Sequence, residues 1–424
     1  MSKPYVTLLG KAVRTIARLR GGGSALPGLF VEKIDPTFVA RILAQLPQGV
    51  VIVSGTNGKT TTTKMVVELL ESQGMKVFTN STGSNFTRGI AAALLGEVDT
   101  REKLDADIAV LELDEAHAVH FVKTIPPRYS LLLNVMRDQL DRFGEIDTTA
   151  KLLAQIAIKT TDTVVMNRED PRVAAIAPLL REQKVSYFGL APKVAKLFPN
   201  DDDMRSQPLQ PKRSLPQADV SLIDFKDTTA HFTVGSHTIT ATLLLQGIYN
   251  VYNAAAAIAM TKAIMGDRLN ETALVEALSQ VTPAFGRGET LTIGGQPLEL
   301  VLVKNPGGFR LSLASFKPEG HQTMIAINDN YADGRDMSWL WDVEFGMFRQ
   351  DGIMEVSGIR AYDMALRLQY EDVIVSHVDP NLADALQHFI TAAGDQPKRI
   401  FCTYTAMLAL RHELGKITDV EMIS

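Results

Sequence analysis

The sequence predicts an α/β protein in which a doubly wound parallel sheet is followed by a second, smaller α/β domain. Short apolar runs of strand length alternate with helix-length stretches along most of the chain, which is typical of parallel strands joined by crossover helices. A glycine-rich loop separates the first such run from an amphipathic helix, as in phosphate-binding loops of this fold class. Because 424 residues exceed what one hydrophobic core usually organises, we expect two or three domains.

Residues 1–47 are predicted to form an N-terminal helical segment. Apolar side chains recur at helical spacing over residues 5–20, with lysine and arginine between them. Residues 21–28 predict a flexible break or turn, and a second amphipathic stretch follows at 36–46. The first helix can pack its apolar stripe on the next domain or lie on an anionic membrane surface, and packed helices are the commoner kind.

Residues 48–289 predict the central domain. A helix is expected at 60–72, and the alanine-rich stretch 249–265 predicts another. Residues 188–220 lose the pattern in a Pro-, Asp- and Lys-rich stretch that predicts an insertion or exposed loop, whereas the alternation over 220–245 predicts antiparallel strands. The expected parallel strands are 50–54, 76–79, 108–113, 129–134 and 163–167.

Residues 290–424 predict the smaller, Rossmann-like α/β domain. Loops at the carboxyl ends of strands carry sites in such domains, so the polar segment 328–342 is a candidate. As an isolated segment it could equally be an aspartate-rich turn with core tryptophans. The expected strands are 298–303, 323–327, 352–356, 372–376 and 398–403.

Composition excludes several classes of function. Apolar residues make up 46% and charged residues 21%, and the net charge of -5 argues against general affinity for nucleic-acid phosphates. Cys402 is the only cysteine, so an internal disulfide and a cysteine-based zinc site are excluded, and its apolar surroundings predict a structural thiol. Since no run reaches the ~20 apolar residues of a membrane span, we expect a cytoplasmic protein.

The loop after the first strand predicts an ATP site. Gly55 and Gly58 allow close backbone approach to phosphates, although only two residues separate them instead of the usual four. Lys59 supplies a cation for the β and γ phosphates, and Thr60 offers a hydroxyl to Mg²⁺. The alternative is a turn with a lone lysine at a helix start. The predicted nucleotide-binding residues here are Gly55, Thr56, Asn57, Gly58, Lys59, Thr60 and Thr61.

This compressed loop, Gly-Thr-Asn-Gly-Lys-Thr-Thr, resembles the nucleotide loop of the Mur ligase and folylpolyglutamate synthetase superfamily. Glu112, in Leu-Glu-Leu-Asp-Glu, is similar to a magnesium-binding glutamate, and Asn250 and Asn253 resemble residues that contact adenine. Arg287, in Phe-Gly-Arg-Gly-Glu, resembles the junction arginine that closes on the γ phosphate, and residues 305–308 resemble an Asn-Pro loop. The resemblance implies a Mur ligase-like central domain with ATP and Mg²⁺. The alternatives are a solvated strand end, helix caps and a surface arginine.

Two further features resemble the MurT branch of this family. The segment preceding the phosphate loop is too short for the domain that holds the UDP part of soluble Mur substrates, which implies a lipid-linked substrate. Residues 326–342, with Asn-Asp-Asn-Tyr-Ala-Asp-Gly-Arg-Asp, and residues 137–145 resemble segments of MurT proteins. Many Mur ligases carry a metal-binding histidine at the position of Gln139, so no metal role is transferred there.

The resemblance implies a ligase subunit of lipid II isoglutaminyl synthase, which uses ATP to activate the D-glutamate α-carboxylate of the peptidoglycan stem as an acyl phosphate. Ammonia would come from a GatD-like glutaminase subunit in a heterodimer, because glutamine hydrolysis needs a cysteine nucleophile that this chain does not offer. We assign to Asp336 the acid that meets the partner's histidine; Asp329, Asp333 and Asp342 are its competitors.

Many MurT proteins carry a four-cysteine zinc ribbon, and residues 188–220 contain no cysteine, so no zinc is expected. His117 and His120, at i, i+3 spacing, are interpreted as surface or interface residues. Two alternatives stay open. A stand-alone amino-acid-adding ligase of the folylpolyglutamate synthetase type would have an aspartate-led loop where Lys304 precedes Asn305. The other is an ATP-binding regulatory subunit that only scaffolds a glutaminase.

Overall fold

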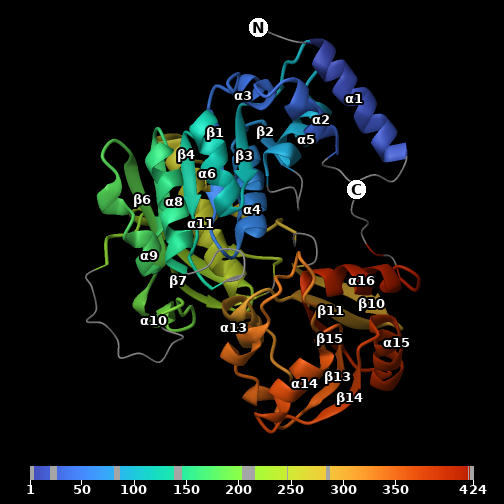
Figure 1. The fold of residues 1–424 in the computed structure, drawn as a ribbon. Coiled ribbons are helices and arrows are strands. Elements are labelled where there is room, and N and C mark those ends of the chain that lie inside the picture. The colour runs from blue at the N-terminus through green and yellow to red at the C-terminus, as the bar shows by residue number, and fades with distance from the viewer. Residues whose placement is uncertain are drawn as a thin grey trace. The chain divides into compact units, whose positions relative to one another are not determined.

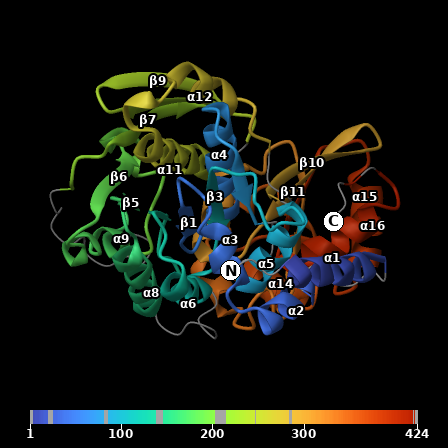
Figure 2. The same cartoon turned by 90° about the horizontal axis from the view of Figure 1, so that it is seen from above.

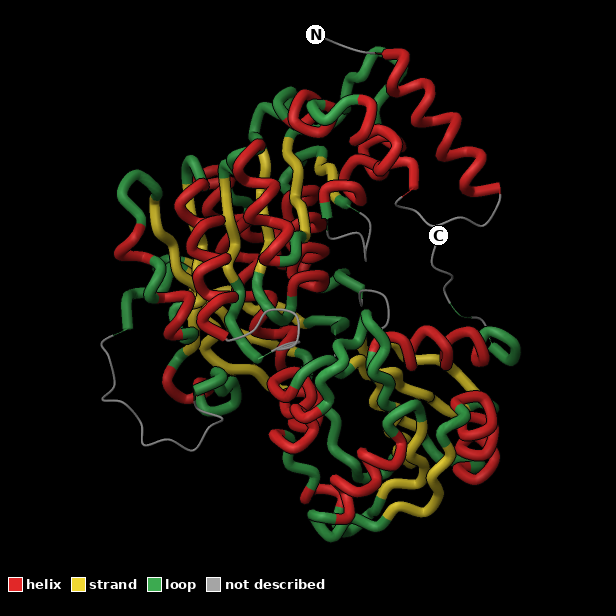
Figure 3. Tube along the Cα trace, viewed as in Figure 1, coloured by secondary structure: helices red, strands yellow, loops and turns green. Residues whose placement is uncertain are grey.

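The computed structural model describes residues 4–19, 26–80, 86–137, 146–202, 215–245, 247–282, 287–418 and 420. The chain divides into two compact units. The first comprises residues 1–135, 147–244 and 250–282, and the second comprises 136–146, 245–249 and 283–424. Helices and strands alternate in both units, as Figure 3 shows. Each unit is described by itself, and the three-part division expected from the sequence remains a proposal.

The first unit is built on a sheet of nine strands among the described residues. From β2 to β7 neighbouring strands are parallel, and β7, β8 and β9 continue as an antiparallel meander. The strands, in sheet order, are β2 (Val77–Thr79), β3 (Ile108–Glu112), β1 (Val50–Ser54), β4 (Tyr129–Leu132), β5 (Thr163–Asn167), β6 (Lys184–Leu190), β7 (Val220–Lys226), β8 (Thr229–Val234) and β9 (His237–Thr242).

Helices cover both faces of the parallel strands, which explains why β1, β3, β4 and β5 are buried along their whole length. Figure 2 shows α6 (Glu115–Thr124) and α8 (Ile146–Lys159) on one face, and α4 (Lys59–Ser72) and α11 (Ile248–Met265) on the other. The predicted doubly wound sheet is confirmed. The other helices of four or more residues that follow β1 in the described part of this unit are α5 (Thr87–Glu97), α9 (Pro171–Ala174), α10 (Pro192–Ala195) and α12 (Glu271–Leu278).

The prediction that residues 188–220 form an insertion or exposed loop does not hold for the whole stretch. β6 runs through Leu190 and pairs in parallel with β5 and β7, and the short α10 follows it. The periodicity did not reveal β6 because its first half, from Lys184, is partly exposed and carries polar side chains, so neither an apolar run nor a clean alternation forms. Residues 203–214 of the predicted insertion lie outside the described residues.

Three helices precede β1: α1 (Pro4–Leu19), α2 (Leu26–Ile34) and α3 (Phe38–Leu43). The predicted break over residues 21–28 is therefore wrong from Leu26 onward. Gly28 serves packing instead: a Cβ there would lie 1.9 Å from the carbonyl oxygen of Arg88 at the start of α5, so only glycine permits this approach of the two helices.

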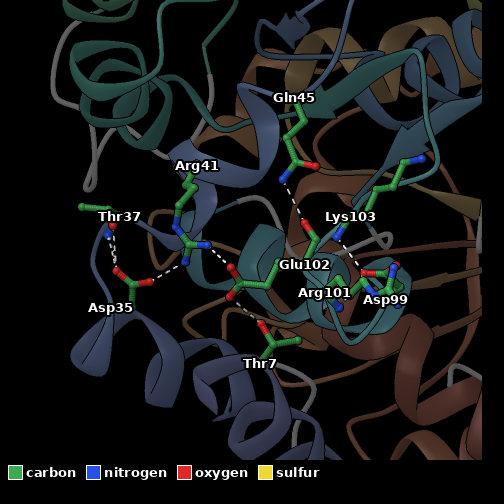
Figure 4. A network of polar contacts seen from close by, with 9 residues as sticks. All are labelled: Thr7, Asp35, Thr37, Arg41, Gln45, Asp99, Arg101, Glu102 and Lys103. Carbon is green, nitrogen blue, oxygen red and sulfur yellow. Dashed lines mark hydrogen bonds and ion pairs between the residues drawn. The ribbon is translucent and has the colours of Figure 1, made fainter. Parts of the chain in front are cut away.

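A buried polar network joins these helices to the loop that precedes β3 (Figure 4). The Arg41 guanidinium contacts the Glu102 carboxylate and lies 2.6 Å from Asp35 Oδ2. Thr7 Oγ1 donates to Glu102 Oε1 at 2.9 Å, and Gln45 Nε2 donates to Glu102 O at 2.9 Å. Since the Asp35 and Glu102 side chains are almost fully buried, each charge needs these partners, and their pairing specifies where α1 and α3 sit on the first unit.

The second unit has a smaller sheet, as predicted, with six strands among the described residues. β10 is antiparallel to β11, and the other neighbours are parallel. The strands, in sheet order, are β10 (Arg287–Ile293), β11 (Gln296–Leu302), β15 (Lys398–Cys402), β12 (Gln322–Ala326), β13 (Ile353–Ser357) and β14 (Val375–Asp379).

Two apolar cores lie on opposite faces of this sheet. One is built with α13 (Pro306–Ser315) and α14 (Ala361–Gln369), and the other with α15 (Leu382–Ala393) and α16 (Tyr404–Leu414) (Figure 1). The predicted strand at 372–376 begins three residues late, at Val375. Asp372 has a φ of 58° and belongs to a turn, which the apolar run that follows it concealed.

Candidate functional site

The loop between β1 and α4 has two glycines in conformations that side chains rarely adopt. Gly55 has a φ of 135° and Gly58 a φ of 86°. A Cβ on Gly55 would lie 3.0 Å from the backbone nitrogen of Asn134, and a Cβ on Gly58 would lie 2.5 Å from Asn253 Oδ1. Both positions therefore require glycine for backbone conformation as well as for space.

Asn134, which follows β4, holds this loop in place. Its backbone oxygen accepts from Thr56 N at 3.0 Å, and its side-chain Oδ1 accepts from Asn57 N at 2.8 Å. Its Nδ2 donates to Asn57 O at 3.0 Å. Sequence analysis missed this residue as part of the site. The sequence shows a polar residue at the end of a predicted strand, but only the structure shows that this strand pairs with β1.

Buried Asp170 supports the same strand end. Its Oδ2 accepts from Val135 N at 2.7 Å, and its Oδ1 accepts from the amides of Arg172 and Val173 at the start of α9. Burial raises the pKa of this carboxyl to about 6, although the three backbone N–H groups act in the opposite direction. Asp170 therefore fixes the turn that carries Asn134, and the sequence offered no sign of this role.

The loop leads directly into the N-terminus of α4. Gly58 O accepts from Thr62 N at 2.9 Å, so the amides of residues 59–61 precede the first helical bond. Such amides have no acceptor within their own helix and carry the positive end of its dipole, which favours an anion. The amides of residues 59–61 thus form a backbone cradle of the kind that binds phosphate, whereas those of Thr56 and Asn57 donate to Asn134.

The Lys59 ammonium lies over this cradle. Its Nζ donates to Gly55 O at 2.5 Å and to Thr56 O at 3.2 Å, and lies 3.9 Å from Glu115 Oε1. The residue is only 7% exposed. A buried cation held mainly by neutral carbonyls is placed to pair with a phosphate at the loop, because an anion would compensate its charge better than carbonyl dipoles do.

Thr60 and Glu112 converge beside the loop. Thr60 Oγ1 donates to Glu112 Oε1 at 2.9 Å, and both side chains are buried. The backbone of Glu112 is fixed by Asn80, whose Oδ1 accepts from Glu112 N at 2.9 Å and whose Nδ2 donates to Glu112 O at 3.0 Å. A carboxylate and a hydroxyl next to a phosphate cradle are oxygen ligands of the kind that Mg²⁺ prefers, so this donor set fits the ion.

The neighbouring carboxylate has a different role. Asp114 caps α6, with its side chain accepting from Ala116 N at 3.2 Å. The two acidic residues at the end of β3 therefore have different roles. Glu112 accepts a hydrogen bond from Thr60, whereas Asp114 accepts one from a backbone N–H at the start of α6.

Of the two asparagines on α11, Asn253 lies against the loop, because its Oδ1 occupies the space next to Gly58. Asn253 Nδ2 is 3.4 Å from Asn250 Oδ1, and Asn250 is buried. The intervening Tyr252 donates to Asn167 Oδ1 at 2.5 Å, which ties α11 to the end of β5. The structure brings both asparagines to the region of the loop, and their contact with adenine remains a proposal.

Some predicted residues are only partly described. Arg287 is the first residue of β10, where its backbone pairs with Val301, but its side chain lies outside the described atoms. Residues 138–145, with Gln139, also lie outside the described residues, and so do residues 283–286.

In the second unit, the candidate acids of the segment 328–342 have different surroundings. Asp333 is 4% exposed; its carboxylate accepts from Thr405 N at 2.8 Å and from Thr405 Oγ1 at 2.5 Å, and burial raises its pKa. Asp329 lies 2.7 Å from the guanidinium of Arg360. These two carboxylates hold the loop to α16 and to the start of α14, respectively.

Asp342 Oδ2 lies 2.7 Å from Arg137 Nη1. Asp336 has fewer contacts than its three competitors: its Oδ1 accepts from Ser338 N at 2.9 Å, two residues along the same segment, whereas Asp329 and Asp342 pair with arginines and Asp333 accepts from Thr405. The Asp336 side chain is half-buried, and the described contacts use one of its two carboxylate oxygens.

Cys402 is fully buried in β15. Burial raises the pKa of its thiol far above the usual range, which disfavours the thiolate that a nucleophile needs. The predicted structural role is confirmed.

Comparisons with known families and proteins agree with this geometry. Residues 53–261 match the Mur ligase middle domain, and residues 302–407 match the MurT ligase C-terminal family. The curated lipid II isoglutaminyl synthase (glutamine-hydrolyzing) subunit MurT of Streptococcus pneumoniae is 30% identical, covering 96% of both chains. The Staphylococcus aureus N315 protein of the same name is 30% identical, covering 87% of both.

Among solved structures, MurF ligase from Thermotoga maritima in complex with ADP superimposes with a TM-score of 0.67 at 17% identity. The match covers 90% of this chain and 84% of that one, and it confirms the predicted Mur ligase-like fold. Family match, near full-length similarity and fold agree, and the chain therefore belongs to the MurT family of Mur ligases.

Proposed function

We propose that the chain is the ATP-dependent ligase subunit of a lipid II isoglutaminyl synthase, which activates the D-glutamate α-carboxylate of the peptidoglycan stem for amidation by ammonia. The observation that carries the proposal is the cradle between β1 and α4, with Lys59 over it and the Thr60–Glu112 pair beside it. It occurs in a chain similar over 96% of its length to a named MurT subunit.

The chemistry follows from this donor set. The substrate carboxylate attacks the γ phosphorus, the bond to the ADP oxygen breaks, and an acyl phosphate forms; ammonia then attacks the carbonyl carbon and phosphate leaves. The amides of residues 59–61 and the Lys59 ammonium would stabilise charge on the phosphates. Thr60 and Glu112 would hold Mg²⁺, which would supply further positive charge next to the phosphates.

The test is an amidation assay with lipid II and ATP, in which either ammonium or glutamine is the nitrogen donor. The purified chain should amidate with ammonium, and glutamine should work only when the glutaminase subunit is added. Transfer of an amino acid instead of ammonia would contradict the proposal and favour a folylpolyglutamate synthetase type of ligase. Absence of ATP turnover under all conditions would favour a purely regulatory subunit.

The magnesium assignment predicts that Glu112→Gln raises the Mg²⁺ concentration needed for half-maximal amidation by at least about tenfold, because an amide oxygen carries no charge to offset the cation. Amidation rates measured across an Mg²⁺ titration check this. Asp114→Asn is the matched control, since Asp114 caps α6 and should leave the requirement unchanged. Equal behaviour of the two variants would remove Glu112 from the metal site.

The ammonia source in our proposal is a GatD-like glutaminase that forms a heterodimer with this chain. Two observations support it: the similar proteins are named as subunits of a glutamine-hydrolyzing enzyme, and the single cysteine of this chain is buried. We further propose that Asp336 accepts an N–H from the partner's catalytic histidine, because its described contact within the chain is one backbone N–H at Oδ1, whereas its three competitors pair with an arginine or are held by Thr405.

We also propose that α1 rests on the surface of the membrane that holds the lipid-linked substrate. Within the described helices, none has the length and apolar character to cross a bilayer. On α1, Val6 is buried against the first unit, whereas Tyr5, Leu8 and Leu9 are 59%, 53% and 49% exposed. Their i, i+3, i+4 spacing places these three on one outward face of the helix.

Sedimentation with vesicles tests this surface contact. The chain should bind vesicles of mixed phosphatidylglycerol and phosphatidylcholine, and Leu8→Glu with Leu9→Glu should lower the bound fraction severalfold. Leu179→Glu is the matched control, because Leu179 is equally exposed, at 54%, on a different part of the first unit. If the double variant and the control bind alike, α1 does not contact the membrane.

A further inference from the structure

Two histidines and a glutamate converge in the second unit, on three elements that the sequence separates. Glu355 on β13 and His377 on β14 are register partners of adjacent parallel strands, so their side chains point to the same face of the sheet. His388 lies on α15, which covers that face. The motif analysis did not find this group, because only strand pairing and helix packing bring its members together.

The contacts within the group are short. His377 Nδ1 lies 2.8 Å from Glu355 Oε1 and 3.1 Å from Oε2, and His388 Nδ1 lies 2.7 Å from Oε2. The two imidazole rings are 4.2 Å apart between centroids. One ligand atom from each residue lies within 4.8 Å of the others, so all three can reach a single ion.

The Glu355 carboxylate is the most buried side chain of the three. The Glu355 side chain is 0% exposed, whereas those of His377 and His388 are 43% and 47% exposed. In the described part of the chain, its side-chain contacts are these two imidazoles, with no lysine or arginine. A buried carboxylate is costly unless a positive charge lies beside it, and a metal ion held by the carboxylate and both imidazoles would supply that charge.

We propose that Glu355, His377 and His388 form a binding site for a divalent transition-metal ion of the zinc class. Both imidazoles direct Nδ1 at the carboxylate, so one ion can accept two nitrogens and one oxygen while compensating the buried charge. Zinc takes this combination of ligands at about 2.0–2.2 Å. Ligand atoms at these distances from a tetrahedral zinc ion lie ~3.3 Å from one another. That is a few tenths of an ångström longer than the nitrogen–oxygen distances between the two histidines and Glu355.

The half-exposed imidazoles leave a route from solvent and a fourth position for water. The site joins the edge strand β14 to β13 and α15, so a bound ion would crosslink the margin of the sheet. It is chemically distinct from the Thr60–Glu112 pair, whose oxygen ligands suit magnesium. The sequence-based expectation of no zinc rested on the absence of cysteines, and our proposal departs from it because this site uses histidine and glutamate ligands.

Cobalt(II) titration of the chelator-dialysed full chain, together with its glutaminase subunit and excess Mg²⁺, tests the proposal. We expect one Co²⁺ per chain with the intense visible absorption of a four-coordinate ion, displacement by an equivalent of Zn²⁺, and a Zn²⁺-dependent rise in Tm. His377→Ala and His388→Ala should each weaken Co²⁺ binding at least about a hundredfold, the equivalent of about 2.7 kcal/mol.

His412→Ala, on α16, is the matched control and should bind Co²⁺ as the parent does. The two histidine variants alter half-exposed side chains and should fold, which circular dichroism verifies; Glu355→Gln, at a buried position, is a secondary test. Absence of stoichiometric Co²⁺ binding, or binding that survives in the folded His377→Ala, His388→Ala double variant, overturns the proposal. Neither result depends on amidation activity, so this experiment tests the metal site independently of the proposed function.

Discussion

Lys59→Ala should abolish amidation with ammonium as well as with glutamine. The side chain lies over the phosphate cradle, and its loss removes the cation that would face the β and γ phosphates during acyl phosphate formation. Because activation precedes the use of ammonia, supplying ammonium directly cannot rescue the variant. We expect the rate to fall by at least about 10²–10³-fold, measured as ATP-dependent amide formation on lipid II.

Lys64→Ala is the matched control for this change. Lys64 lies on the same helix but contacts Glu68 and Thr282, away from the loop, and its removal should leave the rate within about twofold of the parent. In parallel nucleotide titrations, Asn253→Ala and Arg287→Ala test the remaining proposed contacts, and each should weaken ATP binding. Ammonium-driven amidation that persists in Lys59→Ala would contradict the assignment of the cradle.

Asp336→Asn should remove most glutamine-dependent amidation and leave ammonium-dependent amidation intact. The asparagine oxygen can still accept from Ser338 N, so the loop keeps its turn, while the charge that would orient and stabilise a partner histidine is lost. By analogy with orienting acids in other triads, we expect glutamine hydrolysis to fall by about 10³–10⁴-fold. The measurements are glutaminase turnover and the two amidation rates of the purified heterodimer.

Complex assembly must be verified by size-exclusion chromatography, because a variant that fails to assemble would also lose glutamine-dependent activity. Asp342→Asn and Asp329→Asn are the comparison variants. Their carboxylates pair with Arg137 and Arg360, so their loss should affect stability more than glutamine hydrolysis. If one of them abolishes hydrolysis while Asp336→Asn remains active, the acid belongs to that residue instead.

The sequence predicted most of the fold because most helices and strands have a hydrophobic pattern that is visible within their own residues. The wholly buried strands read as apolar runs, and α4 and α11 read as helices. The predictions failed where the position of a residue in the fold differs from what its neighbours in sequence suggest. β6 was missed because it is partly exposed, and Gly28 was assigned to a break, although it lies in α2 and allows close helix packing. Neither fact follows from residues near in sequence.

The residues of the candidate site were likewise predictable only in part. The loop residues and Lys59 could be predicted because their conformations and spacing are local. Asn134 and Asp170 could not, since their roles depend on β4 lying beside β1 and β5 beside β4. Their hydrogen bonds join strand ends that are remote along the chain.

By itself, the sequence determined the chemical types at the phosphate loop, because the φ angles open to glycine and the reach of a lysine or threonine side chain are properties of a few adjacent residues. Only the tertiary structure decided which carboxylates have partners. It pairs Glu112 with Thr60 and leaves Asp114 to cap a helix. It also pairs Asp329 and Asp342 with arginines and Asp333 with Thr405, whereas Asp336 accepts from the backbone of Ser338. The physical reason is that the environment of a charge depends on strand order and helix packing, which residue spacing alone does not encode.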